Sequence, residues 1–411
     1  MSDALESLPH RNEQASVQKV TELSDTGSAS VAETEIANAS LGNSNIQYLC
    51  GTDITLQWLH RKLMEALGAD EPLPHWIAER VDTPSHNKVQ RSKVLKVTFG
   101  WENARMPASV ILKMPMRVQD EESGAVDEEQ NRLINSMFKR ECTVYEWFAK
   151  QKKIAVPRTL HIKKHSTESS CGVIVMEDLG ENGQRGNMKD GLTVDSAKDL
   201  LRNLAIIHAK SILSGEWTTM VPDISPLHYH DLAEKREEAR ATFLKKFTEE
   251  QTEALSSYLS ADYMVSVVTE SNNVGEYGVD RVLVHGQPMA ANLFMQGNDK
   301  IIAILDWTQA HPGCFGEDVA TAICWNLQPK DRHDNQQRLL EFYHYNLVKY
   351  SAGSCQLTLE QVKKAYIHFM PLAMSVMLLL AVNIDMGSEV NEAISERAEV
   401  LANDILGEHG R

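Results

Sequence analysis

VLVHGQPMAANLFMQGNDKIIAILDW, residues 282–307, is the stretch that decides the fold. An apolar strand leads into His285-Gly286, a tight loop carries Asn292, and a second apolar strand ends at Asp306. A turn at Gly297-Asn298 would pair the strands on either side of it as a hairpin. The pattern predicts that an amide oxygen and a carboxylate lie side by side at one end of this hairpin.

Asn292 and Asp306 offer the hard oxygen atoms that Mg²⁺ prefers when nucleotide phosphates share the ion. The alternative is structural, with Asn292 as an ordinary turn residue and Asp306 as a cap at the end of a strand. The polarity and length of the hairpin between them favour metal ligands. The two residues therefore form the candidate metal site.

The order HG-x-x-x-x-x-N, followed about fourteen residues later by an apolar-Asp-aromatic triplet, resembles a known phosphotransferase signature. Aminoglycoside kinases, choline kinases and the CHK kinase-like (ecdysteroid-kinase-like) group share it. The resemblance runs in family order over residues 90–325. It implies an α+β, bilobal protein-kinase-like fold that uses ATP and Mg²⁺ to phosphorylate a hydroxyl group of a small-molecule alcohol.

The same resemblance implies roles for residues of the N-terminal half. Lys113 in VILKMP is similar to the strand lysine that holds the α- and β-phosphates, and Glu141 in KRECTVY to the helix glutamate that pairs with it. Glu177 and Leu179 resemble hinge residues whose backbone meets adenine. Taken alone, Lys113 would be read as a solvated edge-strand lysine and Glu141 as a surface acid.

Three further residues match elements around the catalytic loop. His208 lies in a segment similar to the helix before this loop, and Asp318 resembles the aspartate that supports the loop from below. We expect His208 and His285 to be hydrogen-bonded structural histidines. Neither is expected to act as a base.

The chain departs from the family at Gln287, where the resembling kinases have the aspartate that accepts the proton of the acceptor hydroxyl. A glutamine carbonyl accepts a hydrogen bond but cannot take that proton at neutral pH. Loss of a general base costs on the order of 10²–10⁴ in rate. The candidate catalytic residues are thus Gln287, Lys113 and Glu141, with weakened activity expected.

A second departure concerns the glycines that let backbone amides approach the phosphates in the family. No glycine lies between Gly68 and Gly100. The candidate loop PSHNKVQRSK, residues 84–93, offers hydroxyl groups and cations instead, so that side chains would hold the phosphates.

Two other functions remain open on these residues. A pseudokinase would keep the metal ligands and the Lys113–Glu141 pair and bind nucleotide without efficient transfer. A purely structural interaction protein would bind no nucleotide. Positioning and Mg²⁺ supply most of the catalysis of phosphoryl transfer, which favours a slow kinase.

The pattern of composition along the chain predicts an acidic, disordered tail at 1–49, an N-lobe at 50–180 and a helical C-lobe at 181–411. Within the lobes we expect helices and strands with the following bounds: helices at 52–68, 131–150, 195–213, 230–258 and 369–384, and strands at 93–101 and 109–115.

Overall composition limits the class of protein. Lys and Arg number 41 against 57 Asp and Glu, and the net charge of −16 disfavours nucleic acid as a partner. Six scattered cysteines and an N-terminus without a basic-apolar leader favour reduced thiols and a cytoplasmic location. The apolar stretch 369–384 is shorter than the ~20 residues of a membrane span, so we expect a buried helix.

Two other motifs receive plainer interpretations. Gly180, Gly183 and Gly186 have the wrong spacing for a dinucleotide fingerprint, and we expect a flexible loop after the hinge. The run from His228 to Asp231 has no neighbour that would complete a metal site, and we expect a solvated loop.

Overall fold

The structure is a computed structural model of the chain. The residues that it describes are 47–81, 92–117, 126–164, 172–180, 182–224, 226–234, 237–270, 277–278, 281–297, 299–381 and 388–409. The predicted tail at 1–49 and the candidate phosphate loop at 84–93 lie almost entirely outside them. The predicted lobes at 50–180 and 181–411 both fall within one unit, Glu35–Arg411.

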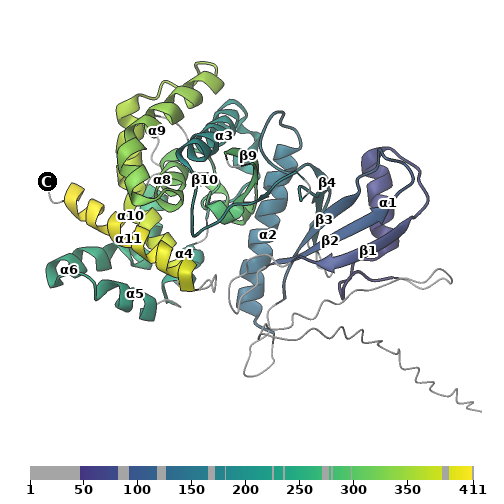
Figure 1. Cartoon of the computed structure of the whole chain (residues 1–411), viewed down its shortest axis with the longest axis horizontal. Coiled ribbons are helices and arrows are strands. Elements are labelled where there is room, and N and C mark those ends of the chain that lie inside the picture. The colour runs from purple at the N-terminus through teal and green to yellow at the C-terminus, as the bar shows by residue number, and fades with distance from the viewer. Residues whose placement is uncertain are drawn as a thin grey trace, which may run out of the picture. The chain divides into compact units, whose positions relative to one another are not determined.

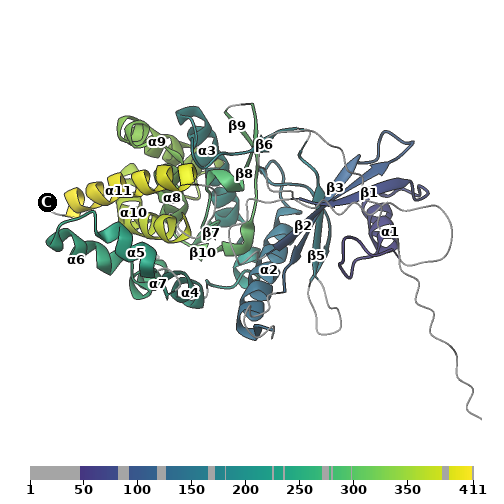
Figure 2. The same cartoon turned by 60° about the horizontal axis from the view of Figure 1, so that its bottom comes forward.

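A five-stranded antiparallel sheet forms the first part of the described chain, in the order β1-β2-β3-β5-β4. Its strands are β1 His75–Arg80, β2 Ser92–Gly100, β3 Ser109–Pro115, β4 Thr159–Lys163 and β5 Val173–Glu177. Strands β2 and β3 confirm the predicted hairpin, with Leu95 opposite Leu112. The sheet spreads its strands side by side in Figure 2.

Side chains of β3 alternate between the two faces of the sheet, and the two faces have different surroundings. Val110, Leu112 and Met114 belong to the core that helix α1, Leu56–Leu67, covers (Figure 1). Because successive side chains point to opposite faces, Lys113 lies on the other side of the sheet. That side is the one that helix α2 covers.

Helix α2, Glu128–Phe148, begins three residues before the predicted start. Asp127 caps it by accepting a hydrogen bond from Gln130 N, and two acidic residues in the first turn suit the positive end of the helix dipole. Its second half is almost wholly buried. This burial fixes Glu141 on the inner face of the helix.

The rest of the described chain is mostly helical and shares one large apolar core. Helix α3 packs on α9, α8 on α10, and α10 lies beside α11 in both views (Figures 1 and 2). The helices are α3 Val194–Leu213, α4 Pro226–Glu234, α5 Glu237–Leu244, α6 Glu249–Tyr258, α7 Ala261–Glu270, α8 Phe315–Asn326, α9 Pro329–Tyr350, α10 Leu359–Ala381 and α11 Ser388–His409. The fold is α+β, as predicted.

Short strands and turns of 3₁₀ helix form much of the segment 282–307 and its surroundings. Strands β8 and β9 form the predicted hairpin, with β6 on the outer side of β8, while β7 pairs with β10. The bounds are β6 Gln184–Arg185, β7 Val282–Val284, β8 Leu293–Gln296, β9 Lys300–Ile304, β10 His311–Gly313, η1 Gly215–Thr219, η2 Ala290–Asn292 and η3 Trp307–Gln309.

The sequence predictions were wrong at several elements. Strands β1 and β4 were missed, because β1 buries only two of its six residues and β4 none. The predicted helix 230–258 is three helices, α4 to α6. The helix predicted at 52–68 begins only at Leu56, after its cap Thr55, and its C-cap is Gly68.

The glycines after the hinge do not form a loose loop. A Cβ atom at Gly183 or Gly186 would clash with the backbone carbonyl of Met295 or Ala290. These glycines therefore let β6 approach β8 closely, which corrects the prediction of a flexible segment.

Helix α10 contains residues 369–381 of the apolar stretch predicted to be a buried helix, and 382–384 lie outside the described residues. Its segment Leu359–Leu379 is long and apolar enough to cross a membrane by length and composition, and 78% of its most apolar window is buried in the structure. Pro371 lies inside this helix.

Gly191 and Gly353 both have a left-handed backbone, but only Gly191 faces a neighbour, the carbonyl of Asn326. We expect Gly191→Ala to lower the free energy of unfolding by about 1–3 kcal/mol more than Gly353→Ala, because overpacking adds to backbone strain. Urea unfolding of both variants measures the difference. Equal losses would show that the contact beneath Gly191 adds nothing.

Candidate functional site

Three charged side chains from distant parts of the chain meet at Lys113 on β3. Its Nζ donates to Glu141 Oε1 at 2.8 Å and to Asp306 Oδ1 at 3.0 Å. Glu141 comes from the buried face of α2, and Asp306 lies two residues beyond the end of β9. The structure thus brings together three residues that the sequence analysis singled out.

The electrostatics of this cluster keep Lys113 charged. Burial disfavours its ammonium group, but the carboxylates of Asp306 and Glu141 outweigh this and raise the pKa of Lys113. Burial also acts against the Asp306 carboxylate, yet Lys113 and a hydrogen bond from Thr308 hold the pKa of Asp306 well below its ordinary value. Lys113 and Asp306 therefore form an ion pair at neutral pH.

The cluster has more negative than positive charge. Burial raises the pKa of Glu141, and its Oε2 is buried without a hydrogen-bond partner among the described residues. The Asp306 side chain keeps 45% of its surface exposed, whereas that of Lys113 keeps 12%. A cation arriving from solvent would thus meet the Asp306 carboxylate first.

The backbone around Asp306 is fixed by its neighbours. Asp306 has a left-handed conformation, with φ 63°, and Thr308 Oγ1 donates to its Oδ1 at 2.7 Å. Trp307 N donates to Glu141 Oε1 at 3.1 Å, and the indole ring is fully buried against Phe148. Through these two contacts Trp307 packs the end of the hairpin against α2.

Asp318, on the first turn of α8, supports the loop before Asn292 as predicted. Its two carboxylate oxygens accept the N–H groups of His285 and Gly286, each at 2.8 Å. His208 Nε2 donates to the same carboxylate at 3.1 Å, and His208 Nδ1 contacts Tyr343 OH at 2.8 Å. His208 is thus a structural residue.

His285 is held in one neutral tautomer. Its Nε2 donates to the carbonyl of Leu305 at 2.9 Å, so its Nδ1 is left to accept the N–H of Gln287 at 3.1 Å. Burial lowers the pKa of His285, which agrees with this arrangement. His285 therefore shapes the loop, and a role as a base is excluded by its bonding.

Asn292 and Asp306 lie at the same end of the β8–β9 hairpin, where Leu293 pairs with Ile304. The Asn292 amide nitrogen donates to the Gln287 carbonyl at 3.0 Å. This hydrogen bond orients the side-chain amide and leaves its oxygen available as a metal ligand. One amide oxygen and one carboxylate oxygen suit Mg²⁺, which keeps several waters and shares phosphate oxygens.

A larger protein cage for a metal is not found within the described ranges, where no group of three or more His, Cys, Asp and Glu side chains could hold an ion. The donor set therefore fits Mg²⁺ brought in with a nucleotide better than a permanently bound structural metal. In that case Asn292 and Asp306 would hold the ion, and Lys113 would hold phosphate oxygens.

The predicted hinge residues differ in what they offer. Glu177 N donates to the Arg158 carbonyl at 3.0 Å, so its amide is already used. The carbonyl of Leu179 accepts Asn182 N at 2.8 Å, while its own N–H has no partner within the described part of the chain. An adenine ring in this place would thus be recognised by the N–H group of Leu179. The N–H group of Glu177 cannot serve in the backbone role predicted for this residue, because it already donates to Arg158.

Sequence reasoning missed Arg185 of β6. It lies near Asp306, whose charge opposes the lowering of the Arg185 pKa by burial, and its Nη1 makes only a long contact of 3.5 Å to the Ala291 carbonyl. A guanidinium group beside the candidate metal ligand Asp306 can bind phosphate. In the sequence Arg185 is a lone arginine between two glycines. This pattern indicates a role at the site only when the pairing of β6 with β8 is known.

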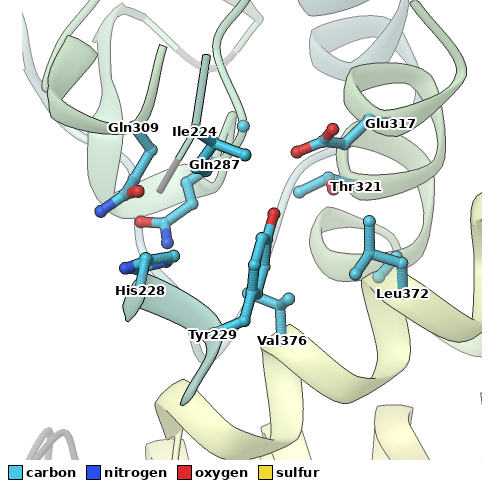
Figure 3. Close-up of a pocket in the computed structure, with 11 residues that line it drawn as sticks. Ile224, His228, Tyr229, Gln287, Gln309, Glu317, Thr321, Leu372 and Val376 are labelled. Atoms are coloured by element: carbon cyan, nitrogen blue, oxygen red, sulfur yellow. The ribbon is translucent and has the colours of Figure 1, made fainter. Parts of the chain in front are cut away.

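A narrow pocket beside Gln287 was also missed (Figure 3). His228 and Tyr229 of α4, read from the sequence as a solvated loop, are both buried and line it, which corrects that prediction. Gln309 and Glu317 line the same pocket. Their convergence depends on contacts between distant segments, which no local motif reveals.

Comparisons with known proteins identify a family and a fold. Residues 49–410 match the model of a family, DUF1679, described as "Uncharacterized oxidoreductase dhs-27". The choline kinase from Cryptosporidium parvum Iowa II is similar in structure, with a TM-score of 0.50, 11% identity, and coverage of 81% of this chain and 90% of that chain. No curated protein matches the sequence significantly.

A microcompartment-associated aminopropanol kinase is also similar, with a TM-score of 0.50 and 16% identity, over 81% of this chain and 94% of that chain. At such identities the likeness shows the fold alone. The fold is kinase-like, with a small antiparallel sheet and a mostly helical remainder, as the sequence predicted.

Asp318→Asn should lower the free energy of unfolding by about 1–3 kcal/mol, because an amide NH₂ would face one of the two loop N–H groups. Its hydrogen bonds hold the pKa of Asp318 below its ordinary 3.8 despite burial. The difference from wild type should therefore be full above pH 3.8 and shrink as the pH falls through the lower, folded-state pKa.

Urea unfolding at several pH values checks this dependence. The exposed Asp334→Asn on α9 serves as the control and should leave the unfolding free energy within about 0.5 kcal/mol of wild type. A loss in Asp318→Asn that does not change with pH would contradict the account of the loop.

Proposed function

The chain belongs to the DUF1679 family, and we propose that it is an ATP- and Mg²⁺-dependent phosphotransferase acting on a hydroxyl group of a small molecule. The observation that carries the proposal is the meeting of Lys113, Glu141 and Asp306 on a kinase-like fold. Asn292 at the same end of the hairpin adds a second candidate ligand for Mg²⁺.

Each residue has a role that its contacts support. Lys113 binds phosphate oxygens, Glu141 orients the Lys113 ammonium, and Asn292 and Asp306 hold the ion. Leu179 N–H meets the adenine ring, and Arg185 adds positive charge where the glycine-rich loop is lacking. Mg²⁺ supplies neutralisation of the charge that develops on the transferring phosphoryl group.

Gln287 favours a second candidate function, a pseudokinase that binds nucleotide without efficient transfer. Its backbone is placed by His285 and Asn292, and its side chain lines the narrow pocket. A glutamine there can orient a hydroxyl group but cannot take its proton. Slow transfer is the function we favour, because Lys113, Glu141 and both candidate metal ligands are retained.

The oxidoreductase in the family's description finds no support in this site. A dinucleotide fold needs a helix that begins at its glycine-rich turn. Here Gly183 and Gly186 flank strand β6, and the next helix, α3, begins only at Val194.

Transfer should be measurable as ADP release from Mg·ATP by the purified chain, with choline, aminopropanol and an ecdysteroid offered as separate acceptors. Asp306→Asn should lower the rate at least about 100-fold, because it removes the charged metal ligand. Lys300→Ala, at an exposed position on β9, should leave the rate unchanged. Wild-type rates no higher than those of Asp306→Asn, with every acceptor, would favour the pseudokinase.

A further inference from the structure

The pocket beside Gln287 lies between the catalytic loop and the helical part of the chain. Its polar wall is formed by Gln287, Gln309, Glu317 and Tyr229. Figure 3 shows the amides of Gln287 and Gln309 on one side of the Tyr229 ring and the Glu317 carboxyl group on the other. Apolar side chains of α10 close the opposite side. The space open to a water-sized sphere is about 10 Å³, which holds one water molecule.

Glu317 brings a carboxylate to this pocket. The residue is only 5% exposed, and its Oε2 accepts His311 Nε2 at 3.1 Å. His311 Nδ1 donates to the carbonyl of Gln309 at 2.8 Å, so both ring nitrogens face acceptors. An imidazolium ring satisfies both, and Glu317 raises the pKa of His311 despite its burial.

The second oxygen of this carboxylate faces the catalytic loop. Glu317 Oε1 lies 3.6 Å from the position that a Cβ atom would take at Gly286, the residue before Gln287. The hydrogen bond to His311 uses only Oε2, and Glu317 lines the pocket. The first turn of α8 also favours a negative charge at this place.

The backbone fixes this relation between carboxylate and loop. Asp318, the next residue of α8, accepts the N–H groups of His285 and Gly286. Glu317 and Gln287 are therefore each adjacent in the chain to a residue that takes part in these hydrogen bonds. Nearby, Gln309 is 5% exposed and its Oε1 is buried without a partner among the described residues, so the pocket has an acceptor that a bound hydroxyl could satisfy.

We propose that Glu317 supplies the carboxylate that position 287 lacks and receives the proton of the acceptor hydroxyl. The inference rests on the proposed function. As the acceptor oxygen bonds to the γ-phosphorus of ATP, its O–H bond breaks and the proton passes to Glu317 Oε1. The bond from the γ-phosphorus to the bridging oxygen breaks, and ADP leaves with that electron pair.

In this arrangement Gln287 and Gln309 orient the acceptor, and His311 holds Glu317 through its other oxygen. The acceptor must be small at its reactive end, because the pocket admits about one water molecule. Water itself can then act as the acceptor, so the step can be tested before the natural substrate is known.

The test measures phosphate release from Mg·ATP in water, with binding of Mg·ATP followed separately by calorimetry. We expect Glu317→Gln to lower the hydrolysis rate on the order of 10²–10⁴-fold, the usual worth of a general base, and to change the affinity less than about threefold. Gln287→Asp in the Glu317→Gln background should restore the rate at least tenfold, because it returns a carboxylate to the loop.

Two further variants separate catalysis from structure. Glu317→Asp keeps a carboxylate and should retain more activity than Glu317→Gln, which a merely structural role of the His311 contact would not require. Glu216→Gln, at an exposed carboxylate on η1, should hydrolyse ATP at the wild-type rate. Melting temperatures identify any variant that does not fold, and Glu317→Asp then carries the comparison.

The outcomes divide cleanly. Wild-type hydrolysis in Glu317→Gln, or no rescue by Gln287→Asp, would overturn the role of Glu317. If the wild type binds Mg·ATP but hydrolyses it only after Gln287→Asp, the inference also fails, while the nucleotide site stands. Absence of Mg·ATP binding in the wild type would defeat the proposed function and the inference with it.

Discussion

One ammonium group shared by two carboxylates is the interaction on which the rest of the site depends. A buried lysine charge is costly unless it is paired, and Lys113 is paired twice, by Glu141 and Asp306. Because these partners come from helix α2 and from the end of a distant hairpin, the ion cluster joins the sheet to both of them. It also leaves an excess of negative charge, and Asp306 presents that excess to solvent.

This constraint explains why neighbouring parts of the fold are built as they are. Alternation along β3 places Lys113 on the α2 side, and the buried ring of Trp307 fixes the hairpin end against the same helix. Asp318 orders the loop that carries Gln287 and, through the next residue on α8, the carboxylate of Glu317. The first turn of α8 thus contributes both the residue that bonds the loop and a residue that lines the pocket.

Much of this site could be predicted from the sequence, because its polar residues follow strands whose pattern is plain. Lys113, Glu141, Asn292 and Asp306 were expected to act together. The structure joins Lys113 to Glu141 and Asp306 by hydrogen bonds and places Asn292 at the same end of the hairpin as Asp306. The strand β1 could not be predicted, since few of its residues are buried. Glu317 and Arg185 could not be found either, because their meaning arises from packing between distant segments.

We propose that the Lys113 cluster is a site for Mg²⁺-bound nucleotide. The most direct measurement is calorimetric titration with a non-hydrolysable ATP analogue, with and without Mg²⁺, for the wild type and Lys113→Ala. The account predicts binding that requires Mg²⁺, because the ion must neutralise Asp306 beside the phosphates, and weakening of at least about tenfold in Lys113→Ala. Equal affinity without Mg²⁺, or no effect of Lys113→Ala, would contradict it.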